Sequence, residues 1–231
     1  ATGNDELRPN MMGVYCALAP EGVVFVATDA HKLVRYTNTE VKTEDFSSFI
    51  LPKKPIAHLK NILANSSDTV HVDYSQETHH IRFAFGNFVL YSSLKEGKYP
   101  DYERVIPKEN PNVLTIGRDE FLKSIRRLGI YSSQSTFQVR LSLSEKGLEM
   151  MAEDMDFSYK GSESIQCEYN GEPMEIGFNS RFLREMVENL DVESVRMSFS
   201  KPSRAALISP AVQHDENEDV LMLIMPVMLN Y

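Results

Sequence analysis

Gly22-Val-Val-Phe-Val-Ala-Thr-Asp29 has a second version in this chain, Gly147-Leu-Glu-Met-Met-Ala-Glu-Asp154. A shift of 125 residues places the first stretch on the second and matches the opening glycine and the closing aspartate. The alignment continues without a gap as far as Tyr74, which falls on Phe199. Because turn glycines align as well as apolar positions, the sequence predicts one structural unit that is used twice.

Period-two alternation of apolar side chains predicts strands in both halves of the chain. These strands are expected at residues 22–27, 69–74, 81–85 and 88–91, and again at 138–143, 194–199 and 220–224. The pairs Gly86-Asn87 and Lys146-Gly147 lie where hairpin turns require a positive φ. The patterns together predict mostly antiparallel sheet.

Three segments carry apolar residues at helical spacing, namely residues 55–64, 119–130 and 180–190. A strand starting at Leu114 precedes the second of these helices, whereas the segment from Ala1 to Met12 is too poor in apolar side chains to supply an equivalent strand and helix. We therefore predict an α+β fold in which each complete unit is two helices packed on antiparallel sheet. Residues 1–106 are predicted to be a unit that lacks its first strand and helix, in a fragment cut inside that unit, and residues 107–231 to be a complete one.

Length and charge restrict the class of protein. The 231 residues suit two domains, and a net charge of −9 argues against a protein that covers nucleic acid with its whole surface. Any DNA contact must then use a local basic face. The longest apolar run, residues 220–229, is too short to cross a bilayer, and no signal peptide is recognisable, so we expect a cytoplasmic protein without a membrane contact.

The search for catalytic chemistry gives one weak candidate. Asp29 could orient the imidazole of His31 as a general base, but no serine or cysteine nucleophile has a recognisable setting. The histidines show no metal-ligand spacing, and no glycine-rich phosphate loop is present in the sequence. We expect no catalytic residue, no metal and no cofactor, and a small-molecule enzyme that uses Asp29 and His31 is the alternative hypothesis.

Basic side chains lie on the polar faces of the predicted helices, opposite the apolar stripes. If the repeat places these helices on one side, their charges reinforce one another in a sequence-independent, phosphate-facing surface. The residues are Lys53, Lys54, Lys60, Lys123, Arg126, Arg127, Arg181 and Arg184.

The end of the chain is unusually apolar. Residues 221–229 read Leu-Met-Leu-Ile-Met-Pro-Val-Met-Leu, and Pro226 cannot donate a hydrogen bond to a neighbouring strand. We expect the residues after this proline to leave the sheet. The sequence leaves open whether they pack in the core or line an adaptable apolar groove.

Several separated motifs resemble the bacterial DNA polymerase sliding clamp, the β subunit of DNA polymerase III. They are Ala27-Thr-Asp-Ala-His-Lys-Leu33, Lys98-Tyr-Pro-Asp-Tyr-Glu-Arg-Val-Ile-Pro107, Met174-Glu-Ile-Gly-Phe-Asn179 and Met225-Pro-Val-Met-Leu229. The resemblance covers nearly the whole chain. It implies that the repeated unit is the clamp domain, of which the family has three per subunit, and that the second and third domains are represented here.

The resemblance implies a processivity factor rather than an enzyme. In the family, two subunits close a homodimer ring around duplex DNA, with helices facing the DNA without sequence preference, and the ring tethers the polymerase to its template. The implied partners are duplex DNA, replicative and other DNA polymerases, the clamp loader and repair proteins, which insert a short Gln-Leu-Phe type peptide into a cleft between the second and third domains.

Carried over by motif, the cleft residues come from three parts of the chain. The first set is Met11, Thr28, His31, Lys32 and Leu33, and the second is Pro100, Arg104 and Val105. The third set is Asn179, Phe182, Leu223, Met225, Pro226, Val227, Met228 and Leu229. Ala30, Lys32 and Met228 stand where the family usually has Gly, Arg and Arg. A stand-alone DNA-binding protein is a further alternative, which strong, salt-dependent binding of linear duplex would favour.

Overall fold

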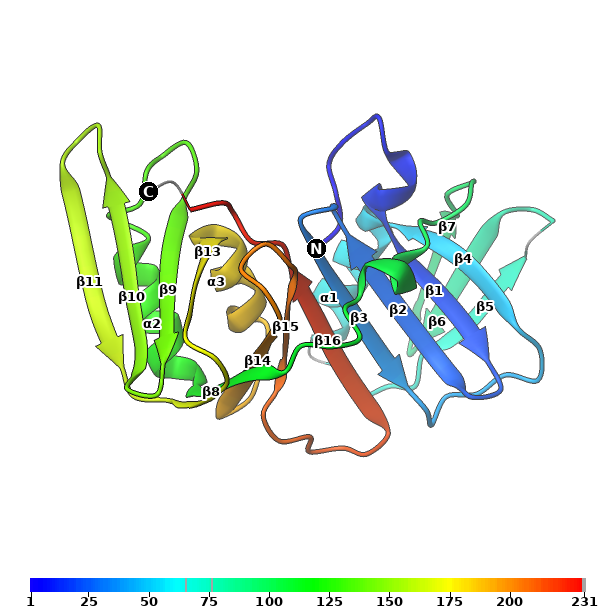
Figure 1. The fold of residues 1–231 in the computed structure, drawn as a ribbon. Coiled ribbons are helices and arrows are strands. Elements are labelled where there is room, and N and C mark those ends of the chain that lie inside the picture. The colour runs from blue at the N-terminus through cyan, green and yellow to red at the C-terminus, as the bar shows by residue number, and fades with distance from the viewer. Residues whose placement is uncertain (65, 76, 230–231) are drawn as a thin grey trace. The chain divides into compact units, whose positions relative to one another are not determined.

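The computed structural model describes residues 1–64, 66–75 and 77–229. The chain divides into two compact units. The first comprises Ala1–Asp101 with Asn217–Asp219, and the second comprises Tyr102–Glu216 with Val220–Tyr231. Figure 1 shows both units with most of their strands and helices labelled.

The first unit contains two antiparallel sheets and one α-helix. After a short 3-10 helix, η1 (Pro9–Met12), the strands β1 (Gly13–Ala19), β2 (Gly22–Thr28), β3 (Lys32–Asn38) and β4 (Ser47–Pro52) pair in the order β3-β2-β1-β4. Helix α1 (Lys53–Leu63) follows. The other sheet is formed by β5 (His71–Ser75), β6 (His80–Phe85) and β7 (Phe88–Ser93).

The second unit adds a strand and a helix before the same series. It begins with η2 (Tyr102–Val105), β8 (Asn112–Gly117) and α2 (Arg118–Leu128). One sheet is β13 (Met174–Asn179), β9 (Gln138–Ser144), β10 (Gly147–Asp154) and β11 (Tyr159–Ile165) in that order. In the other, β12 (Glu168–Asn170), β8, β14 (Ser194–Phe199), β15 (Ala206–Pro210) and β16 (Glu218–Ile224) follow one another, and α3 (Ser180–Glu188) precedes β14.

The element order confirms the internal repeat. The series β1-β2-β3-β4-α1-β5-β6-β7 corresponds to β9-β10-β11-β13-α3-β14-β15-β16. Both aligned turn glycines have positive φ, 146° at Gly22 and 116° at Gly147, a region that side chains with a Cβ rarely adopt. Both aligned aspartates end the following strand in the same way. Asp29 Oδ1 accepts hydrogen bonds from the amides two and three residues later, at 2.9 Å each, and Asp154 Oδ1 does so at 3.0 and 3.3 Å.

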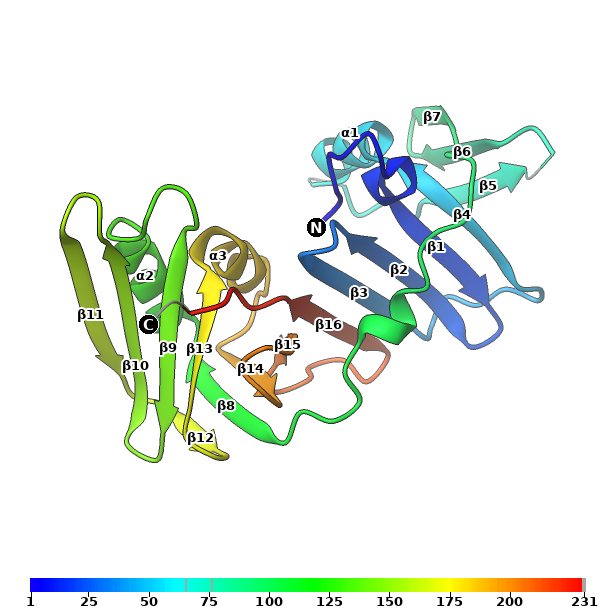
Figure 2. The ribbon, with the colours of Figure 1, turned by 45° about the horizontal axis from the view of Figure 1, so that its top comes forward.

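Burial of apolar stripes explains the helices. In α2 the side chains of Phe121, Ile125 and Leu128 are at most 1% exposed, and in α3 those of Leu183 and Val187 are fully buried. Burial of each such side chain stabilises the fold by about 2 kcal/mol. Figure 2 shows α2 and α3 behind the sheet of β9, β10, β11 and β13. The three predicted helices are confirmed with ends that differ by one or two residues.

Helix α1 packs less completely than α2 and α3. Its Ile56, Leu59, Ile62 and Leu63 are partly buried against a core that contains Cys16, Ile81 and Phe85. Pro55 is the one fully buried residue of this helix, which lies wholly in the described part of the chain. A larger share of its surface therefore stays in contact with solvent.

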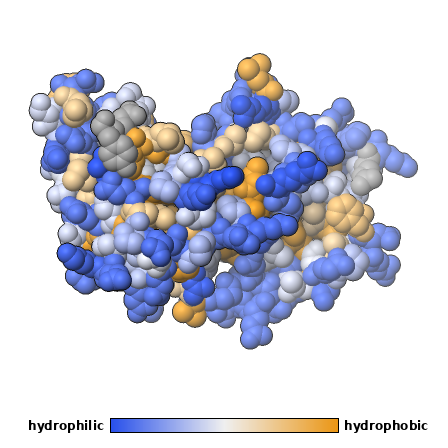
Figure 3. Space-filling model, in the orientation of Figure 1, coloured by the Kyte–Doolittle hydropathy of each residue, from blue (hydrophilic) through white to orange (hydrophobic). Residues whose placement is uncertain are grey.

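The surface is mostly polar. Figure 3 shows a mainly hydrophilic face with small, separated hydrophobic patches. Among residues 1–64, 66–75 and 77–229, no helix is long and apolar enough to span a membrane. Within the same ranges, no group of three or more His, Cys, Asp or Glu side chains is arranged to hold a metal ion.

Candidate functional site

Four of the predicted cleft residues lie in or beside the turn between β2 and β3, namely Thr28, His31, Lys32 and Leu33. The amide of Asp29 donates a hydrogen bond to the carbonyl oxygen of Lys32 at 3.2 Å, which joins the two ends of the turn. The first central residue, Ala30, has a φ of 74°, and the second, His31, does not have a positive φ. A positive-φ position of this kind is ordinarily occupied by glycine. Ala30 therefore holds a backbone conformation that its Cβ disfavours.

The carboxylate of Asp29 holds this turn together. Its Oδ1 accepts from the amides of His31 and Lys32, and its Oδ2 lies 2.8 Å from Nζ of Lys32, whose side chain is only 8% exposed. Burial raises the pKa of Asp29, but the hydrogen bonds from the Lys32 side chain and from the two amides lower it, so that the pKa lies below its usual value. The carboxylate is therefore charged at neutral pH, and its interactions stabilise the turn.

Neighbouring groups complete the packing around the turn. Thr28 Oγ1 donates to the carbonyl oxygen of Lys32 at 2.8 Å and accepts from the amide of Ala30 at 3.2 Å. The amide of Gly3 donates to the carbonyl oxygen of Met11, and a Cβ on Gly3 would lie 3.7 Å from Cβ of Asp29. The backbone of Met11 and the turn are therefore close to one another.

The first prediction concerns Ala30. Changing Ala30→Gly removes the Cβ from a positive-φ position and should stabilise the protein by about 1 kcal/mol, measured by urea unfolding. The control is Ala64→Gly, because Ala64 has a φ of −56°, where glycine brings no relief and should stabilise nothing. Equal effects of the two substitutions would contradict the assignment of strain to Ala30.

The second prediction concerns Asp29. Its folded-state pKa lies below the unfolded value of about 3.9, so its stabilising effect is present above that pH and is lost as the pH falls through the folded pKa. At pH 7, Asp29→Asn should destabilise the protein by about 2 kcal/mol, because the buried Lys32 ammonium loses its counter-charge. It should also flatten the loss of stability below pH 4, followed by urea unfolding.

A double-mutant cycle tests the cause of that loss. Adding Lys32→Met to Asp29→Asn removes the buried cation and should recover part of the stability. If the two changes are simply additive, the 2.8 Å ion pair does not contribute to the stability of the turn.

The predicted residues of this surface differ in exposure. His31 is exposed on the turn, whereas Lys32 and Leu33 are 7% and 1% exposed. Pro100 is exposed in the first unit, and Arg104 and Val105 are exposed on η2 in the second. The interactions of the Asp29 carboxylate with Lys32 and with backbone amides do not favour the alternative in which it orients a catalytic imidazole.

The end of the chain is anchored in the second unit by its backbone. Strand β16 ends at Ile224, and Val227 then forms an isolated bridge with Gly177 of β13, in which the Val227 amide donates to the Gly177 carbonyl oxygen at 2.9 Å. Figure 2 shows this red terminal segment beside β13. A Cβ on Gly177 would meet the carbonyl oxygen of Val227 and Cδ2 of Leu229 at 2.8 Å each. Glycine is therefore needed for the close approach.

The side chains of this segment alternate between burial and exposure. Leu223 is 3% exposed inside β16, while Met225 and Met228 are 40% and 74% exposed. Pro226, Val227 and Leu229 are half-buried. The segment thus packs on the unit and also presents two flexible thioether side chains to solvent.

Two further predicted cleft residues lie at the junction of β13 and α3. Asn179 caps α3, because its Oδ1 accepts from the amides of Arg181 and Phe182 at 3.0 and 3.3 Å. Its Nδ2 donates to the carbonyl oxygen of Thr136 at 3.2 Å. Phe182 is half-buried on the first turn of the helix. Asn179 and Phe182 thus lie two and five residues after Gly177, the residue that pairs with Val227 near the chain end.

The third prediction concerns Gly177. Changing Gly177→Ala should displace the terminal segment and reduce the hydrogen-exchange protection of the Val227 amide about tenfold or more, because overpacking at such a contact costs about 1–3 kcal/mol. Gly117→Ala is the matched control, since a Cβ at Gly117 meets nothing within 4 Å. Unchanged protection in Gly177→Ala would show that the chain end is not held at this position.

The predicted DNA-facing residues of α2 and α3 are exposed, and several of them pair with acids. Arg127 binds Glu163 through both Nε and Nη2, at 2.7 and 2.6 Å. This hydrogen bonding lowers the pKa of Glu163 below its usual value, against a smaller effect of burial. Arg126 and Arg184 both lie near Glu188, with N–O distances of 2.5 and 3.6 Å.

The lysines of α1 form a separate basic set in the first unit. Lys54 and Lys60 are exposed, and Lys53 is half-buried with its ammonium hydrogen-bonded to Asn4. Lys123, on α2, is also exposed. The helices therefore present most of the predicted cations to solvent.

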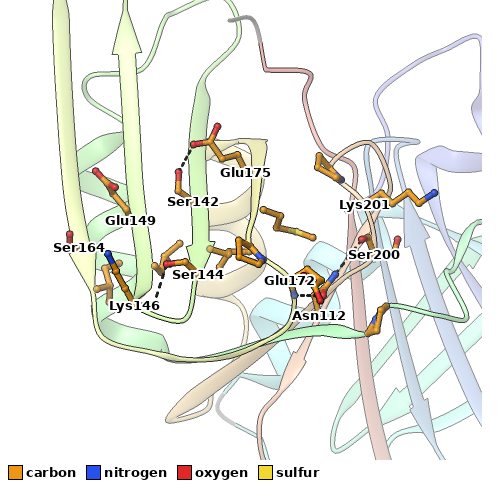
Figure 4. Close-up of a pocket in the computed structure, with 18 of the residues that line it drawn as sticks. Asn112, Ser142, Ser144, Lys146, Glu149, Ser164, Glu172, Glu175, Ser200 and Lys201 are labelled. Carbon is orange, nitrogen blue, oxygen red and sulfur yellow. Dashed lines mark hydrogen bonds between the residues drawn. The ribbon is translucent and has the colours of Figure 1, made fainter.

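A cavity of about 1040 Å³ with polar and apolar lining residues lies elsewhere in the second unit (Figure 4). Two of its polar side chains form hydrogen bonds with neighbouring groups of the protein. Ser142 Oγ donates to Glu175 Oε1 at 3.1 Å, and Asn112 Oδ1 accepts from the amide of Glu172 at 2.9 Å. Among the described residues, no predicted site residue lines this cavity. The described lining residues also include no nucleophile that is paired with a base.

The sequence comparisons decide the family. Residues 1–101 match the family described as DNA polymerase III beta subunit, central domain, and residues 103–228 match the C-terminal domain of the same subunit. The chain belongs to the DNA polymerase III β-subunit family. A beta sliding clamp of Pseudomonas aeruginosa is 32% identical over 205 residues, which are 88% of this chain and 54% of that protein. One from Caulobacter vibrioides is 29% identical over 216 residues, 90% of this chain and 56% of the relative.

Solved sliding clamps share the fold. A P. aeruginosa clamp has a TM-score of 0.92 at 30% identity and covers 99% of this chain, which covers 62% of that structure. A second P. aeruginosa structure, solved bound to griselimycin, has a TM-score of 0.91 at 29% identity, with 99% and 60% coverage. The chain thus spans about 54–62% of the length of these sliding clamps.

Residue patterns did not identify the supporting side chains. Asp29 was considered as a catalytic orienting group, although an aspartate directly after a strand is also a common acceptor for the next amides. Gly177 lies within an apolar strand, a signal that could have predicted a close backbone approach. Glu163 and Glu188 are distant in sequence from the arginines they contact, and no local pattern indicates those pairs.

Proposed function

We propose that this chain is part of a DNA sliding clamp that gives processivity to a replicative polymerase and performs no chemistry itself. Its membership of the β-subunit family supports the clamp, and the exposed cations of the helices support weak contact with duplex DNA despite the net charge of −9. In the complete protein, two subunits would form a ring around the duplex. Polymerases, the clamp loader and repair proteins would share its peptide-binding site.

The observation that carries the peptide-binding proposal is the anchored chain end. The Val227–Gly177 bridge fixes the backbone, while Met225 and Met228 remain 40% and 74% exposed. Exposed methionines can adapt to leucine and phenylalanine anchors of a bound peptide. The griselimycin-bound P. aeruginosa clamp provides a second probe for such a site.

The remaining predicted residues are proposed to contact the same peptide. The exposed turn at His31, the η2 residues Arg104 and Val105, and the α3 residues Asn179 and Phe182 supply polar groups and apolar edges. Leu33 and Leu223 are buried, so they would support the surface from beneath. Lys53, Lys54, Lys60, Lys123, Arg126 and Arg127, with the arginines of α3, are proposed to face the DNA.

The fourth prediction is a peptide-binding measurement by fluorescence anisotropy. A labelled Gln-Leu-Phe type peptide should bind saturably, and griselimycin should displace it. Met228→Ser should weaken binding about tenfold, because a methionine contact of about 1.4 kcal/mol is lost. Met155→Ser is the matched control, since Met155 is also exposed, at 81%, but lies outside the predicted set.

A shortened chain tests the whole terminal segment. Because Ile224 is fully buried in β16, the chain should end at Met225 so that the strand stays intact. This form should lose peptide binding and keep its cooperative unfolding. Full peptide affinity in the shortened chain would contradict the site assignment. Loss of an enzymatic activity in His31→Ala would instead favour the enzyme alternative.

A further inference from the structure

The turn that follows β10 repeats the carboxylate of the turn after β2 but lacks its cation. At Asp29, Oδ1 accepts from two amides and Oδ2 lies 2.8 Å from Nζ of Lys32. At Asp154, Oδ1 accepts from the amides of Asp156 and Phe157. The shift of 125 residues places Phe157 on Lys32, and a phenylalanine side chain has no hydrogen-bond donor. The cation of the first turn therefore has no counterpart in the second.

Asp154 is a buried carboxylate with one oxygen that the described chain does not use. The residue is only 4% exposed, and within residues 1–64, 66–75 and 77–229 no donor or cation contacts its Oδ2. This oxygen is also not one of the fully enclosed polar atoms, so it is open to solvent. Aspartates buried to this degree are almost always paired. The open Oδ2 thus indicates a place for a cation that the described residues do not supply.

Asp154 lines a pocket of about 640 Å³ at the start of β9 and the end of β10. Glu153 and Asp156 are exposed in the same lining. The one guanidinium among the described lining residues belongs to Arg140, and it also lies 3.7 Å from Glu175, which is outside the pocket. The lining therefore carries more negative than positive charge, and its charge favours a cationic ligand.

The pocket adjoins the part of the second unit that holds the chain end. Strand β9 lies between β10 and β13 (Figure 1). Arg140 of β9 is opposite Gly177, which pairs with Val227, and the carbonyl oxygen of Thr136 accepts from Nδ2 of Asn179. Neighbouring strands lie about 4.8 Å apart, so β9 is about 10 Å from the terminal segment. About three residues of an extended peptide span this distance.

We propose that Asp154 binds the ammonium group of a lysine that flanks the anchor motif of a partner peptide. The ammonium would occupy at Oδ2 the place that Nζ of Lys32 takes beside Asp29. Met151, which is half-buried in the pocket lining, would cover part of the methylene stem of the lysine. This inference rests on the peptide-binding site proposed above and adds a charge preference to it. Partners with a lysine about three residues from the motif are bound more tightly than partners without one.

The main test places a lysine at each of the three positions before and after the anchor motif of a labelled Gln-Leu-Phe type peptide. Each lysine peptide is compared by anisotropy with a peptide that has glutamine at the same position. At one of these positions, lysine should tighten binding about tenfold, because the hydrogen bond to the buried carboxylate is charge-assisted. No gain at any position would overturn the proposal. If the glutamine peptides do not bind at all, the peptide-binding site itself is wrong, and this inference is overturned with it.

A neutral variant tests whether Asp154 is the partner of the lysine. Asp154→Asn keeps a side-chain oxygen for the two amides but removes the charge, so it should abolish the advantage of lysine over glutamine. The same variant should bind the glutamine peptide as tightly as the unchanged protein does, which shows that the fold is intact. Glu145→Gln is the matched control, because Glu145 is exposed on the turn at the opposite ends of β9 and β10. Equal loss of the lysine advantage in both variants would show a general effect of charge and would overturn the assignment.

Two amides report on the carboxylate directly. The amides of Asp156 and Phe157 donate to Asp154 Oδ1, so their NMR signals should shift on saturation with the lysine peptide and stay in place with the glutamine peptide. Lysine amide, a free amine without the anchor motif, should leave both signals in place at the same concentration. Equal shifts with lysine amide would mean that the pocket binds free amines, and the peptide assignment would be wrong. A lysine peptide that binds more tightly without shifting either signal would place the ammonium elsewhere and contradict the role of Asp154.

Discussion

Burial of the apolar stripes of α2 and α3 is the constraint on which the second unit depends. Phe121, Ile125 and Leu128 on one helix and Leu183 and Val187 on the other are almost completely removed from solvent. Once these side chains are fixed against the sheets, the rotation of each helix about its axis is fixed too. The cations on the opposite faces of the helices therefore face solvent. A basic surface on an acidic protein is thus a consequence of core packing.

The repeat made much of the fold predictable from the sequence. Gly22 and Gly147 marked the same positive-φ turn in both units, and the helical stripes gave α1, α2 and α3 with small errors at the ends. Strands such as β3 and β11 were harder to predict, because their alternation is interrupted by polar residues at positions that contact solvent. The spacing of apolar residues predicts which side chains are buried. A strand that is exposed along most of its length therefore gives little signal.

The residues of the candidate site were assigned from the family resemblance, and the contacts that support them could not be predicted from the sequence. The motif at residues 27–33 was assigned from the resemblance, yet the reason why its turn is ordered lies in the Asp29 carboxylate and in the Lys32 ammonium beside it. That role depends on a backbone geometry that includes the positive φ of Ala30. Likewise, the need for glycine at position 177 follows from Val227, fifty residues later in the chain. Such contacts between distant segments leave no trace in spacing.

The ion pairs of the basic helices bear on how firmly they could hold DNA. Arg127 pairs with Glu163, and Glu188 lies beside both Arg126 and Arg184, all at the protein surface. Exposed ion pairs of this kind contribute about 0–1 kcal/mol, so a phosphate can replace a carboxylate at little cost and can be replaced again as easily. The acids therefore lower the net affinity for phosphate while keeping each guanidinium extended. In the proposed clamp, a surface built this way would hold the duplex loosely enough to slide, and closure of the ring rather than contact strength would keep it on the DNA.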